Sequence, residues 1–458
     1  MQSSVEPAVP RGHERAVAAL RESYAAIPPG RPIRLAKKTS NLFRFRADTT
    51  EPGLDVAGFD RVLSVDPQTR TAQVQGMTTY EDLVDATLPY GLMPTVVPQL
   101  KTITLGGAVT GLGIESTSFR QGLPHEAVSE MEIITGGGEI VTATKDNEHS
   151  DLFYGFPNSY GTLGYALRLK IDLKPVKPYV RLRHLRFDST AKTAEAIAEI
   201  TKTEEVDGEP VDFLDGVMFS PDELYLTLGT FAENAPYVSD YTDRDIYYRS
   251  LQRRSTDFLT IRDYIWRWDT DWFWCSGAFG LGKPGVRAVW PKSKKRSDVY
   301  RRLVALDKRV QLTARIDRWT GKPPREDVIQ DIEVPVGNLP GFLEFFHREI
   351  GMSPIWLCPL VAQERWPLYP LTPGETFVNV GFWGTVPLPP GSIPELHNRK
   401  IEREVARLDG HKSLYSTAFY ARDEFWRHYD GETYRRLKET YDPEARLLDL
   451  YDKCVRSR

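Results

Sequence analysis

Hydrophobic and polar positions alternate clearly in the first third of the chain, and the alternation predicts two β-hairpins. Val62–Asp66 and Thr71–Gln75 each alternate with a period of two, and a polar turn separates them. Val128–Thr135 and Glu139–Ala143 flank a run of three glycines, which is a strong turn signal. Each pair therefore predicts a strand, a turn and a second strand.

Helix signals lie between these strands. Residues 80–88 are predicted to form a helix, because Thr78 or Thr79 can cap its start and acidic side chains occupy its first turn. Ser150–Phe156 predicts a short helix that begins at a serine cap. Leu167–Leu173 alternates again and predicts a further strand.

The pattern changes character after Pro175. Ala191–Thr203 predicts a long polar helix, and Val211–Phe219 and Leu224–Leu228 predict strands of the kind found at sheet edges. A domain boundary is therefore expected near residues 174–179.

The length of the chain also favours more than one domain, since 458 residues exceed what one ordinary hydrophobic core supports. We expect a first domain over residues 1–178, a second over 179–405, and a C-terminal segment over 406–458 that folds back on the first domain.

Composition narrows the class of protein. The net charge is −4, which does not favour nucleic-acid binding. The 3 cysteines are far apart and form no metal-binding or disulfide pattern, so no metal site is predicted and a reducing compartment is expected. No apolar run has the length of a membrane span, and residues 1–15 do not resemble a signal peptide, so a cytoplasmic location is expected.

Residues 104–122 hold the strongest chemical signal. Five glycines fall within this run, and no charged residue occurs before Glu115. Because glycine is unfavourable inside helices and strands, such a run needs a reason. Close approach of the backbone to a flat or phosphorylated ligand is one reason, and a tight turn between strands is the alternative.

Patches across both expected domains resemble the FAD-binding class of vanillyl-alcohol oxidase and p-cresol methylhydroxylase. The resemblance is closer to the 24-dehydrocholesterol reductase (Diminuto) branch of that class. The segments that carry it are Thr104–Gly122, Ser150–Tyr154, Gly161–Gly164, Pro354–Pro359 and Arg422–Trp426, followed by Asp430 and Gly431. The resemblance implies an α+β fold in which two α+β subdomains cradle FAD and an α+β cap domain covers the flavin.

The resemblance also implies reduction of an isolated carbon-carbon double bond in a lipid, with NADPH as the electron source. Bacterial relatives of this branch include reductases that convert 10-methylene fatty acyl chains into 10-methyl-branched chains. The Arg- and Ala-rich composition is typical of a bacterium with GC-rich DNA, and such an organism would favour a fatty acyl substrate over a sterol. A sterol side-chain reductase, an FAD oxidase of an alcohol or sugar, and a lipid-binding protein with structural FAD are the alternatives.

Carried over onto this sequence, the resemblance places FAD against the first loop, the glycine run and the turn before Leu167. Since residues 34–46 contain neither His nor Cys, the FAD is expected to be held without a covalent bond. Solvated loops and plain turns are the alternatives for each group. The expected FAD-binding residues are Lys38, Thr39, Ser40, Asn41, Leu105, Gly106, Gly107, Thr110, Gly111, Gly113, Ile114, Ser116, Thr117, Ser118, Gly161 and Gly164.

An unactivated double bond must be protonated as hydride arrives, so the protein must hold an acid over it in a dry site. The candidates for this acid are Tyr415, Tyr420, Glu115 and Asp423, with Glu424 and His428 as further possibilities. Each is also explained by a structural role. Cys358 is a candidate for the wall of the pocket, although a buried free cysteine commonly fills space only.

Two further segments have competing interpretations. Trp266–Trp274 holds four Trp and one Phe, and four positive charges follow at 292–296. This combination is typical of a patch that docks on the inner face of a membrane, and the core of the second domain is the alternative. The motif Gly280–Gly285 has GxGxxG spacing, but no strand is predicted before it, so it is interpreted as an irregular loop.

Overall fold

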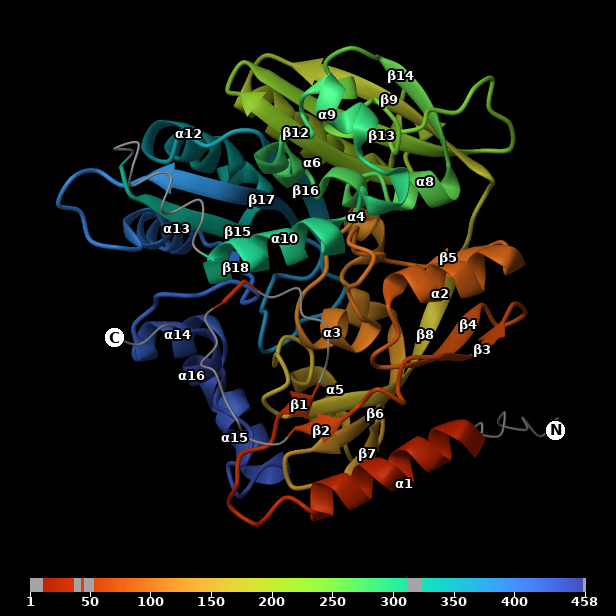
Figure 1. Cartoon of the computed structure of the whole chain (residues 1–458), viewed down its shortest axis with the longest axis vertical. Helices are drawn as coiled ribbons and strands as arrows, with labels where there is room; N and C mark the ends of the chain where they lie inside the picture. The colour runs from red at the N-terminus through yellow and green to blue at the C-terminus, as the bar shows by residue number, and fades with distance from the viewer. Residues whose placement is uncertain (1–10, 37–42, 45–52, 311–322, 456–458) are drawn as a thin grey trace.

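The computed structural model describes residues 11–36, 43–44, 53–310 and 323–455, which form a lower and an upper lobe (Figure 1). The lower lobe is built on a six-stranded sheet with the order β3-β4-β8-β6-β7, and β5 pairs with β8. Its strands are β3 (Val62–Asp66), β4 (Thr71–Gln75), β5 (Leu92–Pro94), β6 (Val128–Thr135), β7 (Ile140–Ala143) and β8 (Gly164–Pro175). Both predicted hairpins are present.

Helices pack around this sheet. They are α1 (Arg11–Ala25), α2 (Tyr80–Thr87), α3 (Leu105–Thr110) and α5 (Ser150–Gly155), and a small parallel pair, β1 (Leu35–Ala36) and β2 (Leu54–Asp55), lies beside them. The short helix α4 (Ser118–Gln121) follows α3 and packs on the sheet of the upper lobe instead. Thr79 caps α2 by accepting a hydrogen bond from the Asp82 amide at 3.2 Å, as predicted. The predicted serine cap of α5 is wrong: the capping position is His149, whose side chain makes no capping hydrogen bond.

The upper lobe contains an eight-stranded antiparallel sheet with the order β14-β9-β13-β12-β16-β17-β15-β18. Its strands are β9 (Tyr179–Phe187), β12 (Phe213–Ser220), β13 (Glu223–Ala232), β14 (Thr256–Thr260), β15 (Arg325–Pro335), β16 (Ile355–Val361), β17 (Thr376–Pro387) and β18 (His411–Lys412). The strands predicted as edges, β12 and β13, lie inside this sheet instead, where cross-strand burial outweighs their polar ends.

The two faces of this sheet differ. The outer face packs against α6 (Thr190–Thr203), α12 (Leu339–Glu349) and α13 (Leu396–Arg407), and the side chains between them form one apolar core. The inner face contributes Phe213, Trp356 and Cys358 to a second core, which continues into the lower lobe. The remaining elements of this lobe are β10 (Glu205–Val206), β11 (Glu209–Pro210), α7 (Tyr247–Ser250), α8 (Ile261–Ile265), α9 (Pro284–Val289) and α10 (Ser297–Val310).

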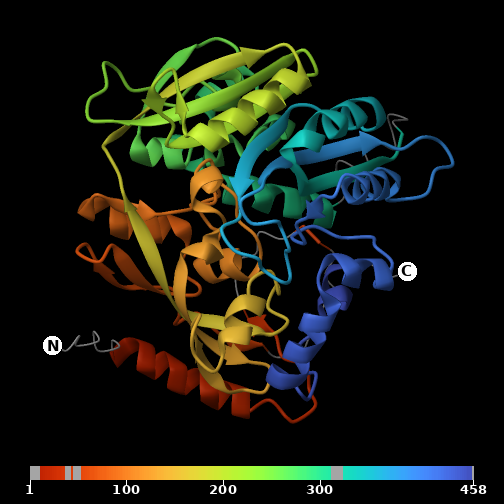
Figure 2. The ribbon, with the colours of Figure 1, turned by 180° about the vertical axis from the view of Figure 1, so that it is seen from behind.

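The C-terminal helices lie along the side of the lower lobe (Figure 2). They are α14 (Arg422–His428), α15 (Gly431–Tyr441) and α16 (Leu450–Cys454). The Lys438 ammonium donates a hydrogen bond to the Thr162 carbonyl at 2.8 Å, and the Ile33 amide donates one to the Arg446 carbonyl, also at 2.8 Å. These contacts bring the end of the chain beside α5, the turn that holds Thr162 and the segment that follows α1. The α+β class is confirmed.

Candidate active site

The glycine run begins as a helix. Thr104 caps α3 by accepting a hydrogen bond from the Gly107 amide at 3.2 Å, and Thr110 closes the helix by donating to the Gly106 carbonyl at 2.7 Å. The predicted loop and the predicted tight turn are therefore both wrong for residues 105–110. Residues 111–117 leave the helix and lead to α4.

Several glycines of the run are explained by the packing of the chain on itself. A Cβ atom on Gly106 would lie 2.7 Å from the Gly76 carbonyl oxygen, and one on Gly113 would meet two prolines at 2.8 and 2.9 Å. Gly122 has a φ of +67°, which favours glycine. Gly107 differs, because its Cβ would meet only the hydroxyl of its own cap, Thr104. The backbone therefore does pack closely at Gly106 and Gly113, but it packs there against other parts of the same chain.

A second tight segment lies beside the run. Asn158, Tyr160 and Gly161 have positive φ angles, and the Tyr160 amide donates to the Thr110 carbonyl at 2.6 Å. Both polar side-chain atoms of Asn158 and the Ser159 hydroxyl are buried and have no partner among the described residues.

Unpartnered buried groups of this kind need an explanation. Their position next to Thr110 and Gly161 suits a ligand rich in hydroxyl and phosphoryl oxygens, such as FAD. The contacts of FAD with Leu105, Gly107, Gly111, Ile114 and Gly164 stay a prediction. Lys38, Thr39, Ser40 and Asn41 lie outside the described residues.

The polar end of the run is tied into a buried ion cluster. The Arg267 guanidinium contacts Glu115 Oε1 at 3.3 Å and Asp215 Oδ2 at 2.8 Å, and its side chain is fully buried. Asp215 Oδ2 also accepts hydrogen bonds from the indoles of Trp268 at 2.9 Å and Trp356 at 3.1 Å. This cluster joins the glycine run of the lower lobe to the inner face of the upper sheet.

Glu115 is therefore a partner in an ion cluster rather than a free acid, although burial raises its pKa. The hydroxyls predicted to face the flavin also have protein partners. Ser116 bonds with the Tyr264 hydroxyl at 2.8 Å, Thr117 donates to the Thr95 carbonyl at 2.7 Å, and Ser118 accepts from the Glu115 amide at 3.1 Å. Their contact with FAD stays a prediction, and it would have to use backbone groups or shared hydroxyls.

Polar side chains also cross the inner face of the upper sheet in one row. Backbone register pairs His184 with Thr227 and Thr227 with Asp215. Farther along, it pairs Cys358 with Asn379, Asn379 with Glu333, and Glu333 with His411. Residues in register point to the same face, so this row runs through a largely apolar core.

Asp331 and Tyr415 form the part of this face that keeps some exposure. The Tyr415 hydroxyl accepts a hydrogen bond from the Trp383 indole at 2.9 Å and lies close enough to the Asp331 carboxyl group for the two to shift each other's pKa. Asn379 donates to Asp331 Oδ1 at 3.3 Å. Gly381 lies opposite Asp331, where a Cβ atom would come within 2.5 Å of both the carboxylate and the Trp383 ring.

The chemistry of this pair follows from its surroundings. Loss of hydration raises the pKa of Asp331 to about 7, since no basic side chain among the described residues contacts its carboxyl group. Burial and the Asp331 charge together raise the pKa of Tyr415 well above its usual value. Both groups thus hold a proton near neutral pH and can act as acids.

Comparison with known protein families identifies a domain within the lower lobe. Residues 8–144 match the family described as FAD binding domain. This chain contains an FAD-binding domain. The match covers the strands β3 to β7 and the glycine run of the lower lobe.

The same comparison finds Delta(24)-sterol reductases. The chain is 26% identical to the reductase of Homo sapiens over 337 residues, which cover 68% of this chain and 60% of the human protein. It is 27% identical to the reductase of Arabidopsis thaliana over 447 residues, which cover 88% of this chain and 77% of the plant protein. The aligned part thus spans about three fifths of the human relative, and the expected likeness to the 24-dehydrocholesterol reductase branch is confirmed.

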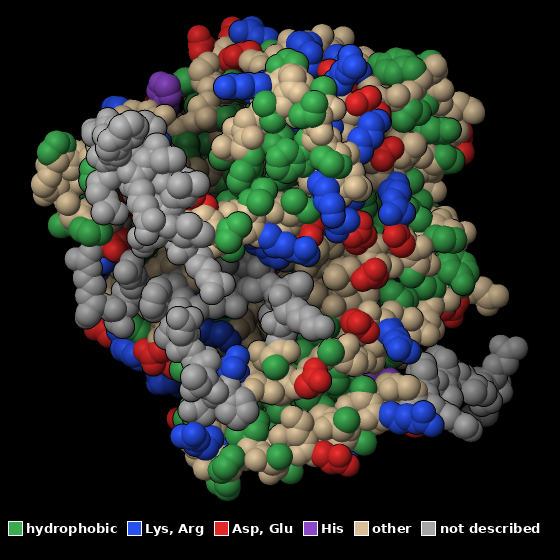
Figure 3. Space-filling model, in the orientation of Figure 1, with side chains coloured by type: hydrophobic (Ala, Val, Ile, Leu, Met, Phe, Trp, Pro, Cys, Tyr) green, Lys and Arg blue, Asp and Glu red, His purple; other side chains and the backbone are tan. Residues whose placement is uncertain are grey.

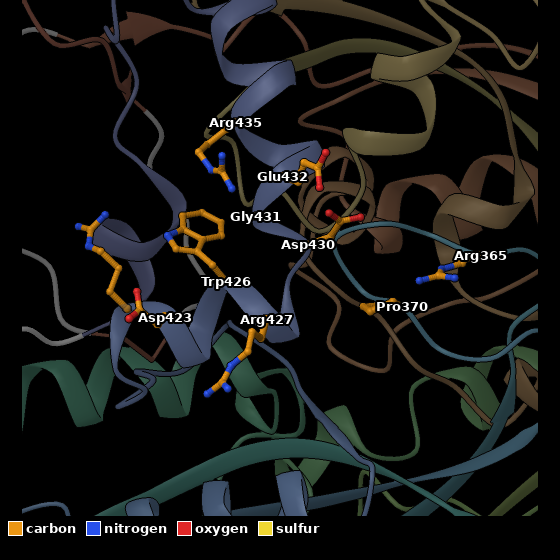
Figure 4. A pocket seen from close by; sticks show the side chains of 10 residues that line it. Arg365, Pro370, Asp423, Trp426, Arg427, Asp430, Gly431, Glu432 and Arg435 are labelled. Carbon is orange, nitrogen blue, oxygen red and sulfur yellow. The ribbon is translucent and has the colours of Figure 1, made fainter.

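The other predicted acids either lie at the surface, away from the inner face of the upper sheet, or already have a structural partner. Asp423 is exposed and lines a surface groove of about 1000 Å³ between α14, α15 and the loop that holds Arg365 and Pro370 (Figure 4). Glu424 caps α14 through the Ala421 amide at 3.4 Å. Tyr420 is buried with its ring 5.2 Å from that of His428. Among these predicted acids, Tyr415 is the one that lies beside the inner face of the upper sheet in a position to give a proton.

Asp331, Glu333, Asn379 and Asp215 are missing from the sequence-based candidates. A signal was present: Asp331 and Glu333 alternate with Ile332 and Val334, which are fully buried on the other face of the strand. Acidic side chains on one face of a buried strand are uncommon enough to mark a site. Cys358 is fully buried in the polar row, which suits a space-filling role as well as a place in the wall of a pocket, so the latter stays a prediction.

The prediction that Trp266–Trp274 docks on a membrane is wrong. Trp266, Trp268 and Trp272 are each no more than 6% exposed, and Phe273 stacks on Trp383 at 4.2 Å. Cations and acidic side chains are interspersed over the face shown in Figure 3, and Lys292 pairs with Asp240 at 3.0 Å. Within the described part of the chain, no helix combines the length and apolarity that a membrane span requires. Residues 280–283 of the GxGxxG motif form an irregular loop, as predicted, whereas Pro284 and Gly285 already begin α9.

Proposed function

We propose that this protein is an FAD-dependent oxidoreductase that reduces an isolated, alkyl-substituted carbon-carbon double bond of a lipid. The relatives are Delta(24)-sterol reductases, so they favour a sterol side chain over the 10-methylene fatty acyl chain that composition suggested. The FAD, once bound and reduced, supplies hydride, and NADPH is the proposed electron source.

The pairing of Asp331 with Tyr415 is the observation that carries this proposal. A double bond without a neighbouring carbonyl cannot accept hydride unless a proton reaches its less substituted carbon. A carboxyl group whose pKa is raised to about 7 keeps a proton that an ordinary surface aspartate would lose. Tyr415, which the Trp383 indole holds in place at 2.9 Å, lies near this carboxyl group, and Asn379 donates to its Oδ1 at 3.3 Å.

Aromatic side chains make the surroundings of this acid dry. Phe273 lies 4.2 Å from Trp383 and 5.4 Å from Trp356, measured between ring centroids. Such rings present apolar surface to a hydrocarbon chain and shield a developing carbocation from water. Trp356 is itself held in place by its hydrogen bond to Asp215. The site therefore suits an alkyl group and offers it one proton.

Half-reactions test the proposal separately from turnover. The purified protein is expected to be yellow, and acid precipitation is expected to release the FAD because no covalent bond holds it. Anaerobic NADPH is expected to bleach the flavin. A sterol with a trisubstituted side-chain double bond is then expected to restore the colour in the absence of oxygen.

The other outcomes distinguish the alternatives. Recovery of the colour with a 10-methylene phospholipid but not with the sterol would make the fatty acyl chain the substrate. Rapid reoxidation by air with formation of peroxide, and no response to either alkene, would support an oxidase and contradict the proposal. Protein that binds no FAD would contradict any flavin chemistry.

A further inference from the structure

Gly381 lies at the point where the acid of the proposed reaction meets the aromatic rings beside it. Backbone register places it directly between Asp331 on β15 and Trp356 on β16, so the three residues share the inner face of the upper sheet. Trp383 follows two residues later on the same face of β17. Gly381 has no side chain to occupy the place between these neighbours.

Two side chains take up the space that a larger residue at position 381 would need. A Cβ atom on Gly381 would lie 2.5 Å from Asp331 Oδ1 and 2.5 Å from Cη2 of the Trp383 ring. Both distances are far shorter than the contact distance of uncharged carbon atoms. Gly381 does not have a positive φ angle, so the backbone conformation does not itself call for glycine. The carboxyl group and the edge of the indole therefore come together over this residue because it is glycine.

The ring and the carboxyl group are each held in this arrangement by other partners. The Trp383 ring stacks on Phe273 with 4.2 Å between the ring centroids, and its N–H donates to the Tyr415 hydroxyl at 2.9 Å. Asn379 donates a hydrogen bond to Asp331 Oδ1 at 3.3 Å. Neither group can move far without loss of one of these contacts, so their meeting is a fixed feature of the site.

We propose that Gly381 is a positioning residue for the acid, because it lets the Trp383 ring cover the Asp331 carboxyl group and keep water from it. The inference rests on the proposed function, in which Asp331 protonates the double bond. Loss of hydration is the largest cause of the raised pKa of Asp331, whereas Asn379 and Tyr415 act in the opposite direction. The cover over the carboxyl group is therefore what keeps its proton in place near neutral pH.

The titratable groups around Asp331 do not replace this cover. They are Glu333 on the same strand, Cys358 on β16, Tyr415 after β18, and His411 on β18, which is in register with Glu333. Burial raises the pKa values of the first three and lowers the pKa of His411 to about 4, so these groups are uncharged near pH 7. Hydration, rather than a neighbouring charge, thus controls the ionisation of Asp331.

Gly381→Ala tests the inference through the pH dependence of the half-reaction in which the alkene reoxidises reduced flavin. The wild-type rate is expected to fall as the pH rises through about 7, where Asp331 loses its proton. The added methyl group separates the ring from the carboxyl group and admits water. The midpoint of the fall is therefore expected about 1 pH unit lower or more, while the rate below that midpoint stays within about 3-fold of wild type.

Trp383→Phe approaches the same contact from the other side and keeps the test valid if Gly381→Ala does not fold. It retains an aromatic ring but removes the indole atoms that lie over Gly381, so the midpoint is again expected to fall. In the Gly381→Ala background, its further effect should be smaller than its effect alone, because both changes open the same cover.

Gly384→Ala is the matched control. Gly384 lies on the same strand, but a Cβ atom there would meet the flexible end of Met352 at 2.7 Å instead of the acid or the indole. The midpoint of the pH profile is expected to stay at the wild-type value in this variant.

A second measurement needs no substrate. Unfolding of wild type and Asp331→Asn between pH 4 and 7 gives the pH-dependent stability that comes from the raised pKa of Asp331. When both proteins also carry Gly381→Ala, this pH-dependent difference is expected to shrink, because a hydrated carboxyl group has a more ordinary pKa in the folded state.

The outcomes separate this inference from the function on which it rests. An unchanged midpoint in Gly381→Ala with normal FAD content would overturn the inference, and so would an equal loss of rate at every pH, since the glycine would then serve packing alone. A shift of the same size in Gly384→Ala would overturn it as well. Absence of any alkene-dependent reoxidation in the wild type would instead contradict the proposed function, and the unfolding measurement would still test the cover over Asp331.

Discussion

The inner face of the upper sheet holds carboxyl groups at two places, and their surroundings differ, because a cation lies beside the carboxyl group at only one of them. On β12, Asp215 shares the Arg267 guanidinium with Glu115 and accepts hydrogen bonds from two indoles. On β15, Asp331 and Glu333 lie in a similar core without a cation among the described residues. The same sheet thus sets one carboxyl group against a cation and leaves two others, whose pKa values are raised, without a cation among the described residues.

This difference separates a structural cluster from a chemical one. A buried charge that is paired with an opposite charge fixes geometry, because removing one partner leaves the other with the full desolvation penalty. A buried acid without a cation is free to exchange a proton, which is what the proposed reduction requires. The Arg267 cluster also spans the two lobes, so it holds the glycine run against the sheet where Asp331 lies.

The largest effect on stability is expected at the Arg267 cluster. Arg267→Met should lower the free energy of unfolding by about 3–5 kcal/mol, because Asp215 and Glu115 lose their buried cation. Denaturant unfolding measures this change. Arg262→Met on the neighbouring helix α8 is the control: its pair with Asp85 is exposed, so a loss under about 1 kcal/mol is expected. Similar losses in both variants would show that the Arg267 cluster has no special structural role.

On β15, where no cation among the described residues pairs with the carboxyl groups, a substitution should change the reaction rate more than the stability. Asp331→Asn keeps the size of the side chain and removes its proton. Reoxidation of reduced flavin by the alkene should slow by about 100-fold or more, while FAD content and reduction by NADPH stay unchanged. Stopped-flow absorbance measures both half-reactions. Unchanged reoxidation would show that Asp331 is not the proton donor and would remove the contrast between the two places.

Local sequence signals predicted the elements of the lower lobe well. The hairpins and α2 were found because alternation, turn glycines and the Thr79 cap act within a few residues of one another. The glycine run lies within the part of the chain that matches an FAD-binding domain, but the sequence showed only part of the reason for its glycines. Gly106 and Gly113 are required by Gly76, Pro98 and Pro124, and the sequence alone does not show that these segments meet.

The acid end of the sheet could not be predicted in the same way. Glu333 gains its character from Asn379 and His411, which are brought beside it only by the register of β17 and β18. The tryptophan stretch shows the converse problem, since aromatic and basic composition does not reveal which side chains point inward. Trp268 is 1% exposed because Asp215 accepts its indole N–H inside the core.

The pH dependence of the free energy of unfolding gives a smaller effect, which distinguishes Asp331 from a carboxylate that is paired with a cation. The pKa of Asp331 is raised to about 7 in the folded protein, so between its ordinary value and pH 7 the folded state binds more protons than the unfolded state. Its contribution to stability is therefore full below about pH 4 and is lost as pH rises through 7, with a slope of at most about 1.4 kcal/mol per pH unit.

Unfolding measured from pH 4 to 8 in wild type and Asp331→Asn tests this sign. The wild type should lose stability relative to the variant as the pH rises. A difference between the two proteins that does not change with pH would mean that Asp331 is ionised throughout this range, as a paired carboxylate would be.

The smallest effect is expected at Tyr415, which connects the acid to the aromatic wall. Tyr415→Phe removes the hydroxyl that accepts from Trp383 at 2.9 Å and lies near Asp331, but it leaves the ring. Alkene-dependent reoxidation should fall by about 10-fold or less, and unfolding free energy by about 1 kcal/mol. If Tyr415 were the donor, its loss would match or exceed that of Asp331→Asn. The ratio of the two rate losses, measured in the same stopped-flow experiment, therefore decides which residue gives the proton and which directs it.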